Sequence, residues 1–207
     1  MAKTLKKSCA AFLSLLMILS TLLYFPSGTF AGMDFGLTAQ AYTPDTTPSK
    51  PQAGDGSQES PYEITSVGEL YWFAGLVNGT LEDGTAQNMS ANAILMTDLV
   101  INENLGDTSG NLNEGEHVTW TPLSNFKGSF NGNKHNIWGL YVNGSSNNVG
   151  FVGTLDHGSI TNLGIHYSYF KGNDYVGAIC GQSDHGVVSN CFSNNYVWGA
   201  NNVGGIC

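Results

Sequence analysis

The chain has 207 residues, contains no Arg, and carries a formal net charge of −9 at pH 7. Such a surface repels phosphate backbones, so nucleic-acid binding is excluded. Acidic polysaccharides are poor ligands for it too, because proteins that act on them usually hold the carboxylates with cations.

The first 41 residues have the layout of a secretory signal peptide. Three lysines precede an almost unbroken apolar run from Cys9 to Phe25, and small residues follow. We expect cleavage after Ala41, with Ala31 ending a second small-x-small site. A retained membrane anchor is the alternative, since the run is at the short end of the ~17–25 residues that span a bilayer. The protein is therefore predicted to be secreted or at the cell surface, and to meet a membrane only through this segment if it stays uncleaved.

Residues 42–60 are predicted to be an extended linker. They are rich in Pro, Ser, Thr and Gly and offer almost nothing to bury. Cleavage after residue 41 would leave four Lys against 15 acidic residues, a formal charge of −11. The folded part then begins near Pro61 and is long enough for one core.

Residues 61–125 are predicted to form an N-terminal cap made of a strand, a helix and irregular strands. Ser66 and Glu69 have the spacing of a capping box, which begins a helix. Apolar residues recur at helical spacing from Leu70 to Val77, and the pattern stops at Asn78. The helix is expected to cover the exposed apolar end of whatever follows it.

A strand and an acidic segment are predicted between this helix and residue 125. The stretch "ANAILMTDLVI" is a strand candidate. Residues 98–116 are acidic and could form a calcium loop, but they lack the regular oxygen-ligand spacing of a known calcium motif, which favours a solvated loop.

From residue 126 to residue 207 the chain is periodic. Val149, Val176 and Val203 are 27 residues apart, whereas two Asp-His-Gly tripeptides are 28 apart, and the extra residue is expected near Gly181. Units of this kind, made of short β-type runs broken by Gly, Asn and Asp, can bury apolar side chains only when they stack. The sequence therefore predicts an all-β protein, a parallel β-helix (β-solenoid) of roughly 27-residue coils with a short N-terminal capping helix.

Equivalent residues of successive coils are expected to form columns about 4.8 Å apart. An earlier, less regular unit places Ile137 and Leu140 where Ile160 and Leu163 recur. The predicted columns are Val149/Val176/Val203, Val152/Ile179/Ile206, Ile160/Val188, Leu163/Cys191, Phe170/Trp198 and a hydrogen-bonded Asn162/Asn190 column.

The repeats resemble those of bacterial GLUG-motif proteins. Gly150-Phe151-Val152-Gly153 matches Gly-Leu-apolar-Gly with Phe in place of Leu, and residues 177–181 are a looser copy with one residue inserted. The stretch "WTPLSNFKGSFNGNKHNI" resembles an upstream element of the family, although it carries Asn where Asp is usual. The resemblance covers roughly residues 54–207. It implies an exported, surface-associated protein, often large, and no single reaction.

The two Asp-His pairs, Asp156-His157 and Asp184-His185, raise the question of catalysis. Neighbouring side chains on extended backbone point in opposite directions, so these pairs are not expected to hydrogen-bond as catalytic groups. An Asp followed two residues later by Gly is typical of a turn, which favours a repeated corner. A transition-metal site on the stacked imidazoles is the alternative. No catalytic, metal or cofactor-binding residue is assigned, and no cofactor is predicted.

The sequence favours a non-catalytic structural or adhesive module that binds glycans or surface proteins. Exposed aromatic rings can stack on sugars or on docking partners, although such rings can also fill coil interiors and corners. A glycosidase or lyase on a parallel β-helix is an alternative, and so is an accessory region of a larger surface peptidase. The candidate ligand contacts are Trp138, Tyr141, Tyr167, Tyr175 and Tyr196.

Three cysteines remain after the signal segment. Cys180 and Cys207 are 27 residues apart and belong to one column, where free thiols are favoured over a disulfide. Cys191 belongs to another column. Because residue 207 falls in mid-coil, we expect the repeats to be incomplete and further coils, a cap or another domain to follow.

Overall fold

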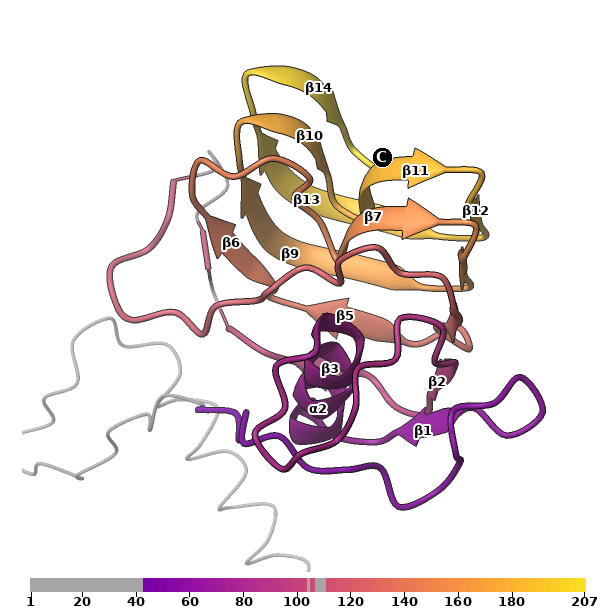
Figure 1. Cartoon of the computed structure of the whole chain (residues 1–207). Coiled ribbons are helices and arrows are strands. Elements are labelled where there is room, and N and C mark those ends of the chain that lie inside the picture. The colour runs from indigo at the N-terminus through magenta and orange to yellow at the C-terminus, as the bar shows by residue number, and fades with distance from the viewer. Residues whose placement is uncertain (1–42, 104, 107–110) are drawn as a thin grey trace, which may run out of the picture. The chain divides into compact units, whose positions relative to one another are not determined.

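A computed structural model describes residues 43–103, 105–106 and 111–207 (Figure 1). In this part of the chain the backbone winds as a parallel β-solenoid of about five turns, which confirms the predicted fold class. The predicted signal peptide lies outside the described residues. The described elements are β1 (Tyr62–Ile64), α2 (Val67–Asn78), β2 (Ala93–Leu95), β3 (Leu99–Val100), β4 (Ser129–Asn131), β5 (Asn136–Trp138), β6 (Tyr141–Asn143), β7 (Val152–Asp156), β8 (Ser159–Thr161), β9 (Gly164–Lys171), β10 (Asp174–Gly177), β11 (Cys180–Asp184), β12 (Val187–Ser189), β13 (Phe192–Trp198) and β14 (Asn201–Gly204).

Strands of successive turns pair in parallel, and they form four sheets in the described part of the chain. One sheet has the order β1-β2-β4-β8-β12, and a second has the order β13-β9-β5-β3 with β6 also paired to β9. The pairs β7-β11 and β10-β14 form the other two. Strands of the predicted cap region, β1 to β3, thus extend the same sheets as the repeats, and their apolar side chains join one common core.

Helix α2 begins where the sequence predicts. The Ser66 hydroxyl oxygen accepts a hydrogen bond from the Glu69 backbone N–H at 3.2 Å, which satisfies one of the unpaired donors of the first turn. The Glu69 carboxylate accepts from the Thr65 backbone N–H at 2.6 Å, one residue earlier than in a standard capping box. The helix ends at Asn78, where Gly79 adopts a left-handed conformation with φ 71°.

The same helix covers the end of the solenoid opposite to residue 207 (Figure 1). Phe73 is fully buried, and its ring centroid lies 6.0 Å from that of Phe126 and 5.9 Å from that of Phe130. Trp72 and Leu76, outside the predicted apolar stripe, are buried as well. The helix therefore acts as the expected lid, but it is enclosed on more sides than a one-sided amphipathic stripe indicates.

The predicted valine column is confirmed, whereas the predicted Val152/Ile179/Ile206 column is wrong. Val149 pairs with Val176, and Val176 pairs with Val203. Val152, however, pairs with Cys180. Two residues of one coil, 150 and 151, correspond to three of the next, 177 to 179, so the extra residue lies just before Cys180, in the predicted region next to Gly181.

The predicted Phe170/Trp198 column is also wrong. Phe170 pairs with Val197, while Trp198 pairs with Lys171 and is 53% exposed. The cause is a bulge at Asn194 to Tyr196, where the later coil is one residue shorter than the coil beneath it. A column assigned from a constant 28-residue spacing is therefore displaced by one residue after this bulge, which exchanges the buried and exposed faces.

The predicted alignment of the earliest unit is wrong by five residues. Ile137 pairs with Ile165 and not with Ile160, whose partner is Phe130. The turn between β4 and β5 is two residues longer than the turn between β8 and β9, so paired residues are 30 apart at Phe130/Ile160 and 28 apart at Ile137/Ile165. The Ile160/Val188 pair is confirmed.

Residues 43–60, expected to be a linker, have no helix or strand but are hydrogen-bonded to the solenoid. The Ser49 backbone N–H donates to the Gly68 carbonyl at 3.2 Å, and the Ala53 carbonyl accepts from the Glu63 N–H at 3.1 Å. Pro51 is buried. The polar side chains of this segment are mostly exposed, as its composition indicates, but its backbone is hydrogen-bonded to the solenoid, which the composition does not predict.

Candidate ligand-binding face

The sheet β13-β9-β5-β3 has one outer face, because side chains along its strands alternate between core and solvent. Ile137 and Ile165 pair with each other and are fully buried. The residues that follow them, Trp138 and His166, also pair and are partly exposed. The predicted contact Trp138 therefore stands on the surface and not in the core.

Four rings on this face form an aromatic shelf, which consists of Trp138, His166, Tyr167 and Phe192. The centroids of Trp138 and His166 are 4.7 Å apart with the ring planes at 19°. Those of His166 and Phe192 are 5.1 Å apart at 32°, and those of Trp138 and Tyr167 are 5.5 Å apart at 28°. Tyr167 is 56% exposed and Phe192 is 58% exposed, so the shelf offers ring surface to solvent.

His166 contributes an uncharged ring to the shelf. Burial lowers its pKa from the ordinary value of 6.5, and the Asp98 carboxylate only partly opposes this shift. Its Nε2 lies 3.0 Å from Asn136 Oδ1, an acceptor, which assigns the proton to Nε2. At neutral pH the imidazole is therefore neutral and packs as an aromatic group.

A groove of about 340 Å³ borders the aromatic shelf. It exists because Gly164 lies in register between Asn136 and Phe192 and has no side chain to fill the space. A Cβ atom at Gly164 would collide with Asn136 Oδ1. The groove is lined by Lys134, Asn136, Asn162, Leu163, Gly164, Asn190 and Phe192.

An amide row consists of Asn131, Asn162 and Asn190, and its last two members line one side of the groove. Asn162 Nδ2 donates to Asn131 Oδ1 at 3.0 Å, and Asn190 Nδ2 donates to Asn162 Oδ1 at 3.3 Å. The predicted Asn162/Asn190 column is thus confirmed and extends one coil further. Asn162 and Asn190 adopt left-handed conformations with φ 54° and 53°, which asparagine tolerates better than other non-glycine residues.

The other predicted aromatic contacts lie elsewhere. Tyr169 pairs with Tyr141 on one side and Tyr196 on the other, which forms a tyrosine column beyond the bulge. Tyr175 is 39% exposed on β10, in a different sheet. The five predicted contacts therefore fall in three places: Trp138 with Tyr167, Tyr141 with Tyr196, and Tyr175 alone.

Two shelf residues, His166 and Phe192, were not among the sequence-predicted contacts. The spacing of 28 residues between Trp138 and His166 is the signal that could have identified the first, because it equals the spacing of the Asp-His pairs. Phe192 follows from no spacing, since its partner in register is Gly164 and its ring reaches sideways to His166.

The expectation that the Asp-His pairs cannot hydrogen-bond is wrong. His157 Nδ1 lies 2.6 Å from Asp156 Oδ1, and His185 Nδ1 lies 2.6 Å from Asp184 Oδ1. Both histidines have left-handed backbone, with φ 60° and 55°, which turns each ring back toward its preceding carboxylate. The two pairs are repeats of one exposed corner, where β7 leads to β8 and β11 leads to β12.

Hydrogen bonds lower the pKa of the Asp156 carboxyl below its ordinary 3.8. The bond to His157 contributes most, and the bond to Lys127 comes next. Lys127 Nζ lies 2.9 Å from Asp156 Oδ2. The carboxylate is thus fixed by two partners and is not poised as a proton acceptor at neutral pH.

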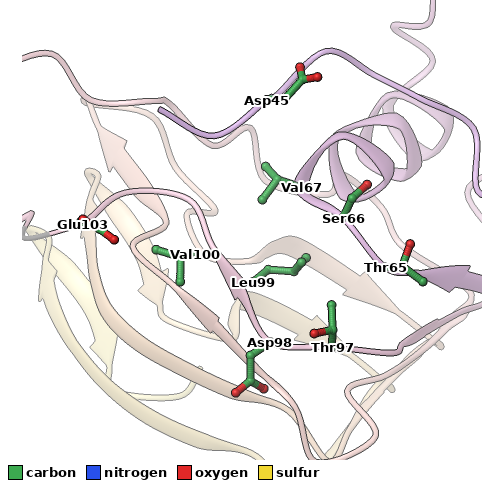
Figure 2. Close-up of a pocket in the computed structure, with 9 residues that line it drawn as sticks. All are labelled: Asp45, Thr65, Ser66, Val67, Thr97, Asp98, Leu99, Val100 and Glu103. Atoms are coloured by element: carbon green, nitrogen blue, oxygen red, sulfur yellow. The ribbon is translucent and has the colours of Figure 1, made fainter. Parts of the chain in front are cut away.

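A second hollow, of about 480 Å³, lies between the start of α2 and the β2–β3 segment (Figure 2). It contains three carboxylates, those of Asp45, Asp98 and Glu103. Figure 2 shows them at separate edges of the hollow, not pointing toward one another. Asp98 is engaged elsewhere: its Oδ1 accepts from the Asn136 backbone N–H at 2.8 Å, which is the main cause of its lowered pKa.

Across residues 43–103, 105–106 and 111–207, no three His, Cys, Asp or Glu side chains gather where they could hold a metal ion. The alternative calcium loop within 98–116 includes residues 104 and 107–110, which lie outside the described part. The same described ranges contain no helix that is long and apolar enough to cross a membrane.

The described cysteines are free thiols with different surroundings. Cys180 is buried, whereas Cys207 is exposed. The Cys180 thiol donates to the Gln182 carbonyl at 2.9 Å. The interaction of the two side chains lowers the pKa of Cys207 to about 7 and, together with burial, raises the pKa of Cys180. Burial raises the pKa of Cys191 as well.

Comparison with known proteins gives one partial likeness. Over 160 residues, 74% of its length, the chain is 32% identical to Halomucin of Haloquadratum walsbyi. The aligned region is 2% of the length of that protein, so the chain spans only a small part of this relative. No protein-family model and no solved structure matches the chain.

Proposed function

We propose that the chain is a non-catalytic structural and adhesive module of a secreted or cell-surface protein. The aromatic shelf is the observation that carries this proposal. Two of its four rings are more than half exposed, and all four are held on strands of a continuous sheet. Contiguous exposed apolar surface of this kind is often a binding site.

The solenoid supports a structural role. Each coil pairs with its neighbours along several sheets, so the face that carries the shelf is built from backbone hydrogen bonds and not from mobile loops. Sites on such rigid elements hold their geometry better than sites on loops. Stacked repeats also create extended surfaces suited to long or repetitive partners.

The likeness to Halomucin supports a location outside the cell. That protein is named as a mucin, and the aligned region is a small part of it. A module of a long exterior protein fits both observations. The lysines and apolar run of residues 1–25 support export by the same reasoning.

Membership of the GLUG-motif repeats is part of the proposal. It is supported by the position of Gly150 and the buried Phe151 at a bend directly before β7, and of Gly153 as the second residue of that strand. The looser copy at residues 177–181 lies directly over this bend in the next coil. The single inserted residue of that copy is the structural offset found before Cys180.

Export is tested with the full chain carrying a C-terminal epitope tag in a bacterial host. We expect the tag in the medium or accessible to protease on intact cells, and N-terminal sequencing to read from Tyr42. A matched variant that lacks residues 2–25 should stay inside the cell. Retention of the unaltered chain in the cytoplasm would contradict the proposal. So would hydrolysis of glycans by the purified protein, since the module is proposed to be non-catalytic.

A further inference from the structure

We infer that the groove and the aromatic shelf together bind a neutral polysaccharide, whose sugar rings stack on the shelf and whose hydroxyls bond to the amide row. This inference rests on the proposed function and gives its adhesive role a ligand class. The two surfaces are adjacent because Phe192 belongs to both: its ring contacts His166 in the shelf and lines the groove beside Asn190.

The shelf supplies the stacking surface. Sugar rings carry C–H groups that pack on aromatic faces, and rings already ordered by mutual stacking lose little conformational freedom on binding. Trp138 and His166 lie nearly parallel at 19°, on neighbouring strands of one sheet. A linear glycan laid along the solenoid axis would meet one aromatic residue per strand, from Trp138 through His166 to Phe192.

The amide row supplies the hydrogen bonds. A carboxamide both donates and accepts, as a sugar hydroxyl does, so the two groups can pair in either direction. Asn190 ends the row among the described residues, is exposed, and bonds through Nδ2 to Asn162. Its Oδ1 and its second amide hydrogen are available to a ligand in the groove.

The electrostatics favour a neutral ligand over an anionic one. Lys134 is the cation that lines the groove, and the Asp98 carboxylate lies close by, bonded to Asn136. The rest of the lining is amide, glycine and apolar. Because the chain carries a net charge of −9, a polyanion would be repelled at longer range.

The groove has the size of a small subsite. Its volume of about 340 Å³ is near the lower end of the ~300–1,000 Å³ typical of small-molecule sites. The missing side chain at Gly164 provides the depth, and the neighbouring shelf lengthens the contact beyond the groove. The site therefore fits successive residues of a chain better than a single free sugar.

The test is titration of the purified protein with cellohexaose, followed by calorimetry and by tryptophan fluorescence, to which Trp138 contributes together with three other tryptophans. We expect saturable binding with a Kd below about 1 mM. Phe192→Ala should raise the Kd about tenfold, the scale of one lost aromatic contact. Phe192→Leu should weaken binding almost as much. Leucine keeps the apolar surface, but it lacks the aromatic ring on which the sugar is proposed to stack.

Trp198→Ala is the matched control. Trp198 lies on the same strand as Phe192 and is similarly exposed, at 53% against 58%, but it does not line the groove. We expect its Kd to stay within about twofold of the parent. Equal losses in both variants would overturn the assignment of the site.

Two further outcomes would overturn the inference while leaving the proposed function intact. One is that neither cellohexaose nor a mannohexaose binds saturably at millimolar concentration, although the tagged chain is exported normally. The other is tighter binding of an oligogalacturonate or of an unstructured peptide than of either neutral hexasaccharide. Failure of export with retained sugar binding would count against the proposed location alone.

Discussion

His157 and His185, one coil apart, stack with their ring centroids 5.0 Å apart and their planes at 16°. Each imidazole is bonded to the aspartate that precedes it, at 2.6 Å. An active site needs an Asp-His pair to be accompanied by other residues with other roles, such as a nucleophile or a charge-stabilising group. Here the same pair recurs in the same place, so the arrangement is a product of stacking identical corners.

The Asp156 carboxyl should titrate below its ordinary pKa of 3.8, and His157→Ala should move the titration back upward. The folded-state pKa is depressed, so the stabilisation is present above the unfolded value and is lost as pH falls through the folded value. Lys127→Ala should produce a smaller upward shift. Carboxyl ¹³C NMR against pH measures both, and an unchanged Asp156 titration in His157→Ala would contradict the assigned hydrogen bond.

The Cys207 thiol should react with iodoacetamide at half its maximal rate near pH 7, because its interaction with the Cys180 side chain lowers its pKa to about 7. The thiolate fraction rises as pH passes upward through this pKa. Cys180→Ala removes this interaction and should move the midpoint upward. Alkylation followed by peptide mass spectrometry gives the rates for each cysteine. Faster labelling of buried Cys180 than of Cys207 at pH 7 is the contrary result.

Phe73→Ala should lower the free energy of unfolding by about 3–5 kcal/mol, the usual cost of removing a buried aromatic side chain. The ring contacts both Phe126 and Phe130, so its loss leaves a cavity between α2 and the first coils. Urea denaturation measures the change. Trp198→Ala, at an exposed site, should stay within about 0.5 kcal/mol of the parent and serves as the control.

Two substitutions at Asn162 separate its side-chain bonds from its backbone conformation. Asn162→Gly keeps the left-handed φ of 54° accessible but removes the bonds to Asn131 and Asn190, and should cost about 1–2 kcal/mol. Asn162→Ala should lower the free energy of unfolding by about 1–2 kcal/mol more than Asn162→Gly, because alanine tolerates the left-handed conformation less well than glycine does. Thermal or urea unfolding compares the two variants. An alanine variant as stable as the glycine variant would show that this conformation is not retained.

The sequence predicted those features of the fold that depend on repetition or on local chemistry. The start of α2 follows from Ser66 and Glu69, whose hydrogen bonds are local. The valine column follows from a constant spacing, because stacked coils of equal length must align equal positions. The amide row follows in the same way.

The errors arise where one coil differs from the next. No residue in the sequence marks the bulge that pairs Val197 with Phe170 and leaves Trp198 exposed. The Asp156–His157 bond depends on a left-handed φ that a residue other than glycine adopts only in a particular turn. Both depend on the backbone of neighbouring coils, which spacing alone does not describe.

The candidate site was predicted only in its chemistry. Aromatic residues were expected on the surface, and Trp138 and Tyr167 are found together there. Phe192 completes the shelf because Gly164 leaves room beneath it, a packing relationship between residues 28 apart. Such a relationship becomes visible only when the register of the strands is known.

Adjacent coils differ in length by one residue at two places, and the later coil is longer at the first and shorter at the second. The coil that runs from β10 to β13 gains a residue before β11 and loses one within β13 relative to the coil beneath it, so the columns on either side stay aligned. The gain and the loss cancel, so the strands before and after them keep their register with the neighbouring coils. Searches that demand a fixed period would divide these coils into unrelated fragments, whereas searches that allow a one-residue gap at these two positions would recover them as a single repeat.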